Sequence, residues 1–514
     1  LISTAGPERD RAAGDGDRDE AGQFRSQGGS EDRGSGRFIV RKVAGSVCAR
    51  ILADPDRIAT GMRRIDRRLR SRRVVTPTGV IPAIVALGEG VIVAVEPWRA
   101  TGSRADWPGL EDFGELAILP GVIDTHVHVN EPGRADWEGF ASATRAAAAG
   151  GVTTLVDMPL NSIPATTDVE ALEAKRRAAT GKCAVDVGFW GGVVPGNLAA
   201  LEPMHRAGVL GFKAFLTPSG VDEFLEVGIR ELELAAREVS RLGSVLLVHA
   251  ESPAALVPPE EIPLFDPRRY TSWLASRPAV AEAAAIDLLI DVVRRTGASV
   301  HVVHLSSAAG LERVRAGRAE GLTLSAESCP HYLTFAAEEV IDGATEWKCA
   351  PPIRGGDDRE ALWRGLEEGS ISQVSSDHSP CPPVMKGRAS GDFFAAWGGI
   401  ASLQIALAAT WTGATARGCG LGKLAEWMSA APARIAGLAR RKGAIAVGRD
   451  ADLVVFDPEA TFVVDPRALH HRHPVTPYAG RTLSGRVVRT YLRGEAVFDG
   501  SRVESGRGLL IASS

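Results

Sequence analysis

Six side chains that could bind metal ions or move protons are distributed over about 250 residues of the chain. His126 and His128 lie two positions apart in DTHVHV, so on a strand they project from the same face and can bind one divalent ion together. Each of the six lies within or at the end of an otherwise apolar run, where an unpartnered polar group costs about 2–7 kcal/mol. Taken singly, His249 or His304 would be read as a hydrogen-bonded core histidine. Because all six share this placement, we expect a common partner, a pair of metal ions. The candidates are His126, His128, Lys213, His249, His304 and Asp377.

Lys213, in GFKAFLT, allows two interpretations. Its stem could be buried while its ammonium reaches water. Alternatively, burial lowers the pKa of the amine, and the neutral amine can react with carbon dioxide. The resulting carbamate is an anionic oxygen ligand that could bridge two cations and compensate their charge.

Asp377, in SSDHSP, is the candidate catalytic residue. A carboxylate here can bind one metal ion and accept a proton from the attacking water, whose pKa a metal ion lowers to about 7. It can then pass the proton to a leaving nitrogen. The adjacent His378 could support the site or serve packing alone.

The positions of these residues depend on eight short apolar runs that alternate with Ala-, Leu-, Glu- and Arg-rich helical segments. This alternation predicts an α/β protein with a parallel sheet covered by helices, and eight units suit a (β/α)8 TIM-type barrel. The carboxyl ends of barrel strands form the active-site face, where the six residues would meet. The apolar runs span 121–129, 152–159, 184–192, 210–217, 244–251, 299–306, 322–331 and 372–379.

Both ends of the barrel sequence continue into β-rich segments. Residues 71–96 predict short strands, and 443–457 and 485–500 predict β-hairpins. We therefore expect a small β-sandwich from 62–116 and 436–514, with the metal-dependent barrel at 117–435. Residues 1–61 are rich in Gly, Asp, Arg and Ser, which predicts a disordered tail or an extension outside the native protein.

Composition excludes several other classes of protein. The 514 residues carry a formal charge of −4, so a nucleic-acid partner is not expected. No apolar stretch approaches the length of a membrane span. Six scattered cysteines without a C-x-x-C pair favour a reducing, cytoplasmic location over a disulfide framework.

Several motifs together resemble the allantoinases, a family of cyclic amidohydrolases. They are DTHVHVNEPGRADWEG (124–139), MPLNS (158–162), GFKAFLTPSGVDEF (211–224), KCAPPIR (348–354) and SSDHSPCPP (375–383), and the similarity extends over about 71–505. The resemblance implies a binuclear site, usually zinc, and a homotetramer. In it, N6-carboxylated Lys213 would bridge an ion on His126, His128 and Asp377 and an ion on His249 and His304.

The resemblance also implies allantoin as substrate and allantoate as product, within purine and ureide breakdown. Related dihydroorotases carry an arginine where this chain has Asn130, and a neutral amide suits a neutral ureido-hydantoin. Hydantoinases and dihydropyrimidinases stay open as alternatives, as does a non-catalytic scaffold of the same fold. Asn130, Asn161, Ala350 and Ser379 are the candidate substrate contacts, although each could instead serve a turn.

Overall fold

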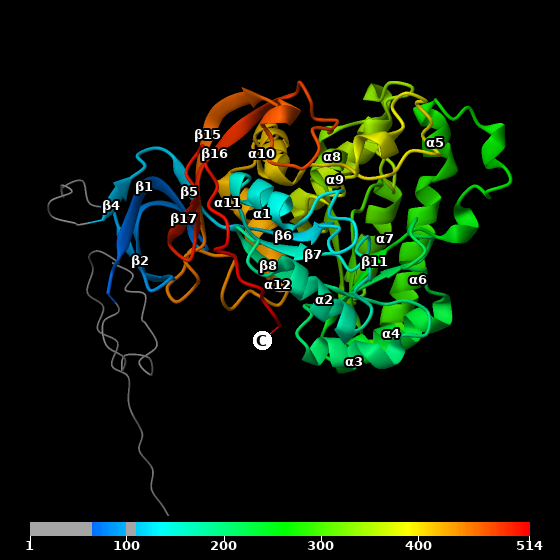
Figure 1. The fold of residues 1–514 in the computed structure, drawn as a ribbon, viewed down its shortest axis with the longest axis horizontal. Coiled ribbons are helices and arrows are strands. Elements are labelled where there is room, and N and C mark those ends of the chain that lie inside the picture. The colour runs from blue at the N-terminus through cyan, green and yellow to red at the C-terminus, as the bar shows by residue number, and fades with distance from the viewer. Residues whose placement is uncertain (1–63, 99–108, 514) are drawn as a thin grey trace, which may run out of the picture. The chain divides into compact units, whose positions relative to one another are not determined.

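The computed structural model describes residues 64–98 and 109–513. The segment 1–61, predicted to be disordered or non-native, lies outside the described residues. In the described part, every predicted apolar run contains a strand. Figure 1 labels several of these strands within the barrel. The barrel strands are β6 (Val122–Val127), β7 (Val152–Asp157), β8 (Asp186–Phe189), β9 (Gly191–Gly192), β10 (Phe212–Phe215), β11 (Val245–His249), β12 (Ser299–Val302), β13 (Leu324–Ser328) and β14 (Gln373–Val374).

These strands pair in parallel and in chain order, β6 to β8 and then β9 to β14. The predicted run 184–192 is divided at Trp190, whose indole nitrogen donates to the Thr125 carbonyl at 2.8 Å. The circle closes where Val127 forms a parallel bridge with His378, and the His128 amide donates to the His378 carbonyl at 2.8 Å. The predicted (β/α)8 barrel is confirmed.

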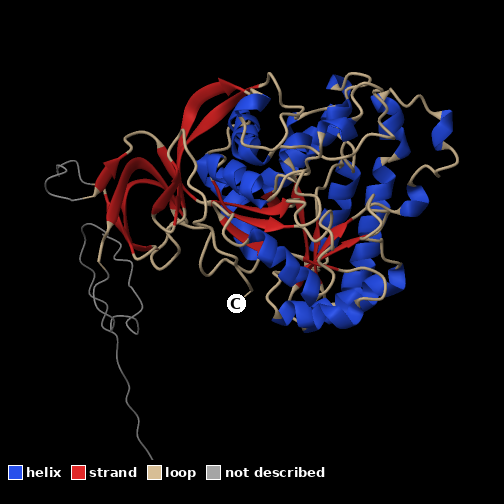
Figure 2. Cartoon of the chain, viewed as in Figure 1, coloured by secondary structure: helices blue, strands red, loops and turns tan. Residues whose placement is uncertain are grey.

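Helices cover the outside of the parallel strands (Figure 2). Their apolar faces pack on Val- and Leu-rich strands that are buried on both sides, as expected for a parallel sheet. No helix of the described residues combines the length and apolar character needed to cross a bilayer. The helices are α1 (Phe140–Ala149), α2 (Val169–Ala179), α3 (Leu198–Arg206), α4 (Ile229–Arg241), α5 (Tyr270–Ser276), α6 (Ala279–Thr296), α7 (Ala308–Ala319), α8 (Pro330–Thr334), α9 (Gly356–Glu368), α10 (Ala406–Ala416), α11 (Leu421–Ala425) and α12 (Ala431–Ile435).

A second sheet contains strands from both ends of the described chain, in the order β17-β16-β15-β5-β1-β2-β3, with β4 beside β1. Side chains from both ends of the chain, such as Leu69 and Val85 from the first two strands and Tyr491 from β16, pack in one cluster, so this sheet encloses its own core. The strands are β1 (Arg67–Thr76), β2 (Gly79–Gly88), β3 (Val91–Pro97), β4 (Leu110–Asp112), β5 (Ala117–Pro120), β15 (Leu453–Val463), β16 (Thr482–Leu492) and β17 (Glu495–Phe498).

Two features of this terminal domain differ from the local sequence pattern. The hairpin predicted at 443–457 is wrong, because β15 begins only at Leu453 and pairs with β16, which begins at Thr482. The β16–β17 hairpin does form. β5 pairs with both β1 and β15, so the terminal sheet continues to Pro120, beyond residue 116. The divisions at 116 and 435 stay predictions.

Candidate metal centre

The six predicted ligands lie together at the carboxyl ends of the barrel strands. They come from β6, β10 and β11 and from the turns that follow β6, β12 and β14. At most 6% of any of these residues is exposed to solvent. Polar groups buried this deeply need partners, and here they converge on one another. The six are His126, His128, Lys213, His249, His304 and Asp377.

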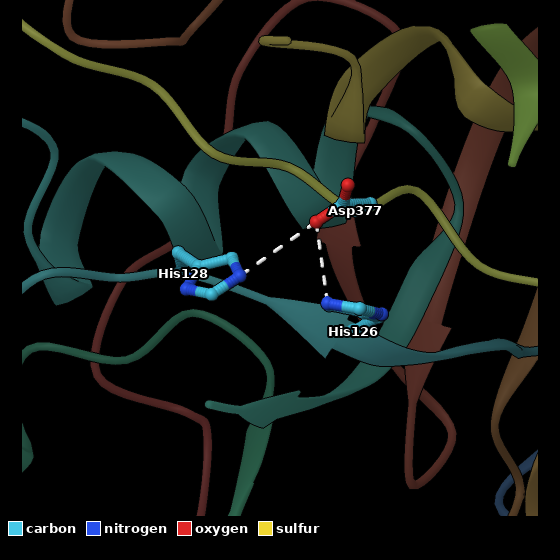
Figure 3. A group of neighbouring side chains, drawn as sticks. All are labelled: His126, His128 and Asp377. Carbon is cyan, nitrogen blue, oxygen red and sulfur yellow. Dashed lines mark ion pairs between the residues drawn. The ribbon is translucent and has the colours of Figure 1, made fainter. Parts of the chain in front are cut away.

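His126, His128 and Asp377 form the first ligand group (Figure 3). One oxygen of Asp377, Oδ1, lies 3.2 Å from Nε2 of His126 and 3.6 Å from Nε2 of His128. Burial opposes ionisation of Asp377, but the two imidazoles outweigh it and lower its pKa to about 2. Burial likewise lowers the pKa of His128 to about 4, so this ring is neutral at pH 7. A carboxylate and two imidazoles are suitable ligands for a divalent ion such as Zn²⁺.

Outer contacts hold the rings of this group in place. Nδ1 of His126 lies 2.5 Å from Oε1 of Glu327. The carboxylate accepts the Nδ1 proton, which leaves the Nε2 lone pair directed at the group, the arrangement expected of a metal-binding histidine. On the other ring, the amide of Asn161 lies 3.3 Å from Nδ1 of His128.

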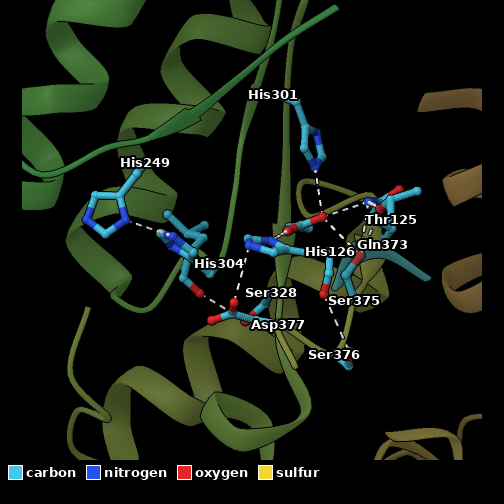
Figure 4. Close-up of polar contacts among 12 residues, drawn as sticks. Thr125, His126, His249, His301, His304, Ser328, Gln373, Ser375, Ser376 and Asp377 are labelled. Carbon is cyan, nitrogen blue, oxygen red and sulfur yellow. Dashed lines mark hydrogen bonds and ion pairs between the residues drawn. The ribbon is translucent and has the colours of Figure 1, made fainter. Parts of the chain in front are cut away.

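His249 and His304, which the sequence analysis predicts as ligands of a second ion, lie together and are called the second ligand group (Figure 4). Nδ1 of His249 lies 2.9 Å from Nε2 of His304, so one nitrogen of each ring faces the other ring. The opposite nitrogen of His249 lies 2.7 Å from Oε2 of Glu251, and Arg277 in turn binds that carboxylate. Burial lowers the pKa of both rings, that of His304 well below its usual range. Two neutral imidazoles therefore face one point without an anion between them.

Lys213 is the unusual member of the set. Among the described residues its amine has no hydrogen-bond partner, although only 1% of the residue is exposed. Burial lowers its pKa to about 7. Its charge acts on His128 of the first group and on His249 and His304 of the second. An unpartnered amine beside both groups fits the bridging carbamate, because carboxylation replaces the ammonium with two anionic oxygens.

The two ligand groups adjoin, since the ring centroids of His126 and His304 are 5.4 Å apart. Backbone strain is concentrated here as well. Six non-glycine residues in the described segments have positive φ, and four of them belong to this region. Two are predicted ligands, His304 (43°) and Asp377 (44°). The other two are predicted substrate contacts, Asn130 (67°) and Asn161 (68°). This left-handed conformation costs about 1–3 kcal/mol where the side chain does not favour it, and it persists where function requires it.

A cavity of about 350 Å³ opens beside the ligands. Three of the four predicted substrate contacts, Asn161, Ala350 and Ser379, line it. Asn130 is buried outside the lining and donates from its amide to the Pro380 carbonyl at 3.3 Å. The segment 394–399, which the sequence analysis did not predict as part of the site, also forms part of the cavity wall.

The sequence analysis did not predict that Glu327, Glu251 and Arg277 belong to the site. Glu327 could have been found, because it is a charged residue in the buried strand β13, which is the pattern that singled out the ligands. For His378, the packing interpretation holds: its Nδ1 accepts from the Ser402 amide at 3.1 Å, and its carbonyl closes the barrel.

The residues 117–497 match the amidohydrolase family. The chain belongs to this family. It is 51% identical over 454 residues to an allantoinase of Streptomyces avermitilis, an alignment that covers 88% of this chain and 99% of that protein. It is 45% identical to an allantoinase of Arabidopsis thaliana, over 83% of this chain and 87% of the relative. The resemblance to allantoinases, stated above from the motifs, is confirmed.

Solved structures of related amidohydrolases have the same fold. An L-hydantoinase of Arthrobacter aurescens superposes with a TM-score of 0.82 at 30% identity, covering 87% of this chain and 100% of that one. A dihydropyrimidinase of Brevibacillus agri superposes with a TM-score of 0.78 at 26% identity, covering 86% and 97%. The protein is therefore a hydrolase of the cyclic-amide class with a divalent-metal site.

Proposed function

We propose that this protein hydrolyses the ring amide of allantoin to give allantoate. The observation that carries the proposal is the convergence of a carboxylate, four imidazoles and an unpartnered lysine beside a cavity, in a chain 51% identical to an allantoinase over nearly its full length. Position 130 carries asparagine, so the arginine that dihydroorotases have there to bind a ring carboxylate is absent, although the Asn130 amide itself is turned to Pro380.

The ligand assignment is part of the proposal. His126, His128 and Asp377 would hold one ion, His249 and His304 the other, and Lys213 would bridge them as N6-carboxylysine. Carboxylation needs a neutral amine, whose nitrogen bonds to the carbon of carbon dioxide and then loses a proton. The pKa of about 7 leaves a large fraction of Lys213 neutral at pH 7. We propose zinc as the metal, because imidazole nitrogen and carboxylate oxygen are its common ligands.

When bound, two divalent ions polarise the substrate carbonyl and lower the pKa of water into the neutral range. The protein's own contribution is proton transfer and positioning. Asp377, ionised at pH 7 because its pKa is about 2, accepts the proton of the attacking water and donates it to the leaving ring nitrogen. Glu327 and Glu251 fix the rings of His126 and His249. Asn161, Ala350 and Ser379 are in position to contact the ring from the cavity wall.

The hydantoinase and dihydropyrimidinase alternatives rest on the solved structures with the same fold. Turnover of allantoin, hydantoin, dihydrouracil and dihydroorotate by the purified holoenzyme decides among them. We expect the highest kcat/KM with allantoin and none with dihydroorotate. A higher kcat/KM for dihydrouracil or hydantoin would refute the substrate and leave the chemistry in place.

Two further measurements test the remaining parts of the proposal. Metal analysis should find about two ions per chain, and a metal-free, inactive protein would instead support a scaffold of this fold. Sedimentation of the full chain should give a homotetramer, the assembly that the family resemblance implies. A cytoplasmic location stays a prediction.

A further inference from the structure

Two buried lysines bind the cavity wall formed by the segment 394–399. Lys348 itself lines the cavity, whereas Lys386 lies outside its lining. The ammonium of Lys348 donates to the carbonyls of Phe394 (3.1 Å) and Ala396 (2.5 Å). The ammonium of Lys386 donates to the carbonyls of Trp397 (3.1 Å) and Gly399. Four of the six carbonyls in this segment are thus bound by lysine side chains, and all six residues line the cavity.

Besides these carbonyls, the Lys348 ammonium faces the Trp273 ring at 4.4 Å from its centroid. The charges of Asp392 and Glu346 act on Lys348 and Lys386, respectively, without direct contact. Neither lysine forms an ion pair with a carboxylate among the residues that the structure describes, and no more than 6% of either is exposed. Burial lowers the pKa of Lys348 to about 7, and it lowers that of Lys386 as well. A buried ammonium is costly, and packing alone would be served better by methionine or leucine. Their placement therefore points to a task on the carbonyls that they bind.

The same segment is held from its amide side. The Trp397 amide donates to the Met385 carbonyl at 2.8 Å, and the amides of Phe394 and Ala395 donate to Asp392. The Gly399 amide donates at 2.8 Å to the carbonyl of Lys348, which also precedes the cavity residues Cys349 and Ala350. Lys348 thereby connects two stretches of the cavity lining that are separated by more than 40 residues in the chain.

We propose that Lys348 and Lys386 are positioning residues that hold the segment 394–399 as a rigid wall for the ring substrate. They set substrate affinity and selectivity, and the hydrolytic step is left to the ligand groups. If the wall is already ordered in the free enzyme, substrate binding does not have to order it. The conformational entropy lost on binding is then smaller, and the affinity is higher. This inference rests on the proposed function for its kinetic part, whereas the rigidity of the wall does not depend on the reaction.

The test replaces Lys386 with methionine in the full-length holoenzyme. Losing two charge-assisted hydrogen bonds should raise KM for allantoin about tenfold or more, with kcat changed by less than about threefold. Metal content should stay at the wild-type value. Hydrogen exchange of the peptide 392–400, measured without substrate, should be about tenfold faster.

Two variants serve as controls. Lys386→Arg keeps donors at this position and should restore part of the affinity and of the protection from exchange. Lys423→Met removes a surface lysine that also donates to a backbone carbonyl, that of Glu367 at 3.0 Å, but lies outside the cavity lining. It should change neither KM nor exchange in 392–400. If Lys386→Met does not fold, Lys348→Met is measured in the same way.

Unchanged KM together with unchanged exchange of 392–400 would overturn the inference. So would a loss of kcat and metal content at constant KM, because the lysines would then support the ligands instead of the wall. If the wild-type enzyme hydrolyses none of the four cyclic amides, the proposed function fails, and the exchange measurement still decides whether these lysines hold the wall.

Discussion

The two ligand groups differ in how far the folded chain alone completes them. In the first group, two imidazole nitrogens face a carboxylate oxygen at 3.2 and 3.6 Å, so an anion is already present to compensate a cation. In the second group, two imidazoles face each other at 2.9 Å without an anion between them. Within the described segments the nearby Lys213 amine has no hydrogen-bond partner, and it lies 4.7 Å from the centroid of the Phe215 ring. The comparison teaches that folding alone supplies the first group with an anion, whereas the second group needs one from elsewhere. In the proposed assignment, carboxylated Lys213 supplies it.

The largest effect is expected for Lys213→Ala. Without the carbamate, two cations would lack a bridging anion, so metal content and activity should fall together, activity by about 10⁴-fold or more. Metal analysis and kcat on allantoin measure this. Short carboxylic acids should restore part of both by supplying the anion. Full activity in this variant would show that the second group needs no bridge.

Asp377→Asn should reduce kcat by about 10²- to 10⁴-fold, because the proton acceptor is lost. The first group also loses its anion, while the second is untouched, so metal content should fall by about one ion per chain. Kinetics and metal analysis of the same sample separate the two effects. Loss of both ions at once would mean that the two groups are not independent.

Glu251→Gln and Glu327→Gln compare the outer supports of the groups. Each removes the carboxylate partner of one ligand histidine, His249 or His126. Metal affinity should fall about 10- to 100-fold in each variant, at the corresponding ion. Titration with Zn²⁺ after chelation measures both affinities. If each variant lowered the affinity for both ions equally, the two groups would not bind separate ions independently.

The smallest effect concerns pH. In the metal-free protein the pKa of His128 is about 4, below the value of about 6.5 for an unfolded chain. Between these values the unfolded state binds more protons, so the free energy of unfolding should decrease as pH falls, by at most about 1.4 kcal/mol per pH unit for this ring. Urea denaturation of chelated protein from pH 7 to 4 measures the slope. His128→Gln should flatten it.

Much of the fold follows from local pattern. Runs such as 244–251 and 299–306 are rich in Val and Leu and alternate with helical segments, which is typical of a parallel barrel. The hairpin expected at 443–457 fails because the partner of β15 lies on β16, and no local signal encodes that pairing. Pairing between strands distant in the chain depends on the whole sheet, and periodicity reports only which faces of a strand are apolar.

The candidate site, too, could be predicted only in part from the sequence. Polar residues in buried strands were recognisable one by one, and strand direction alone predicts that they meet at one edge. Asn130 was recognisable as a type, yet its amide is turned to Pro380 and away from the cavity. Side-chain direction after a strand depends on backbone angles such as the positive φ of Asn130, which a sequence does not show.

By itself, then, the sequence determined the barrel, the order of the ligand residues along it, and the kinship with amidohydrolases. Each of these follows from residue type and local spacing. The tertiary structure alone decided which carboxylates support which imidazoles, and it brought two buried lysines into contact with the carbonyls of the wall 394–399. These contacts join segments whose separation is set only when the barrel closes, since closure fixes the register of every strand at once.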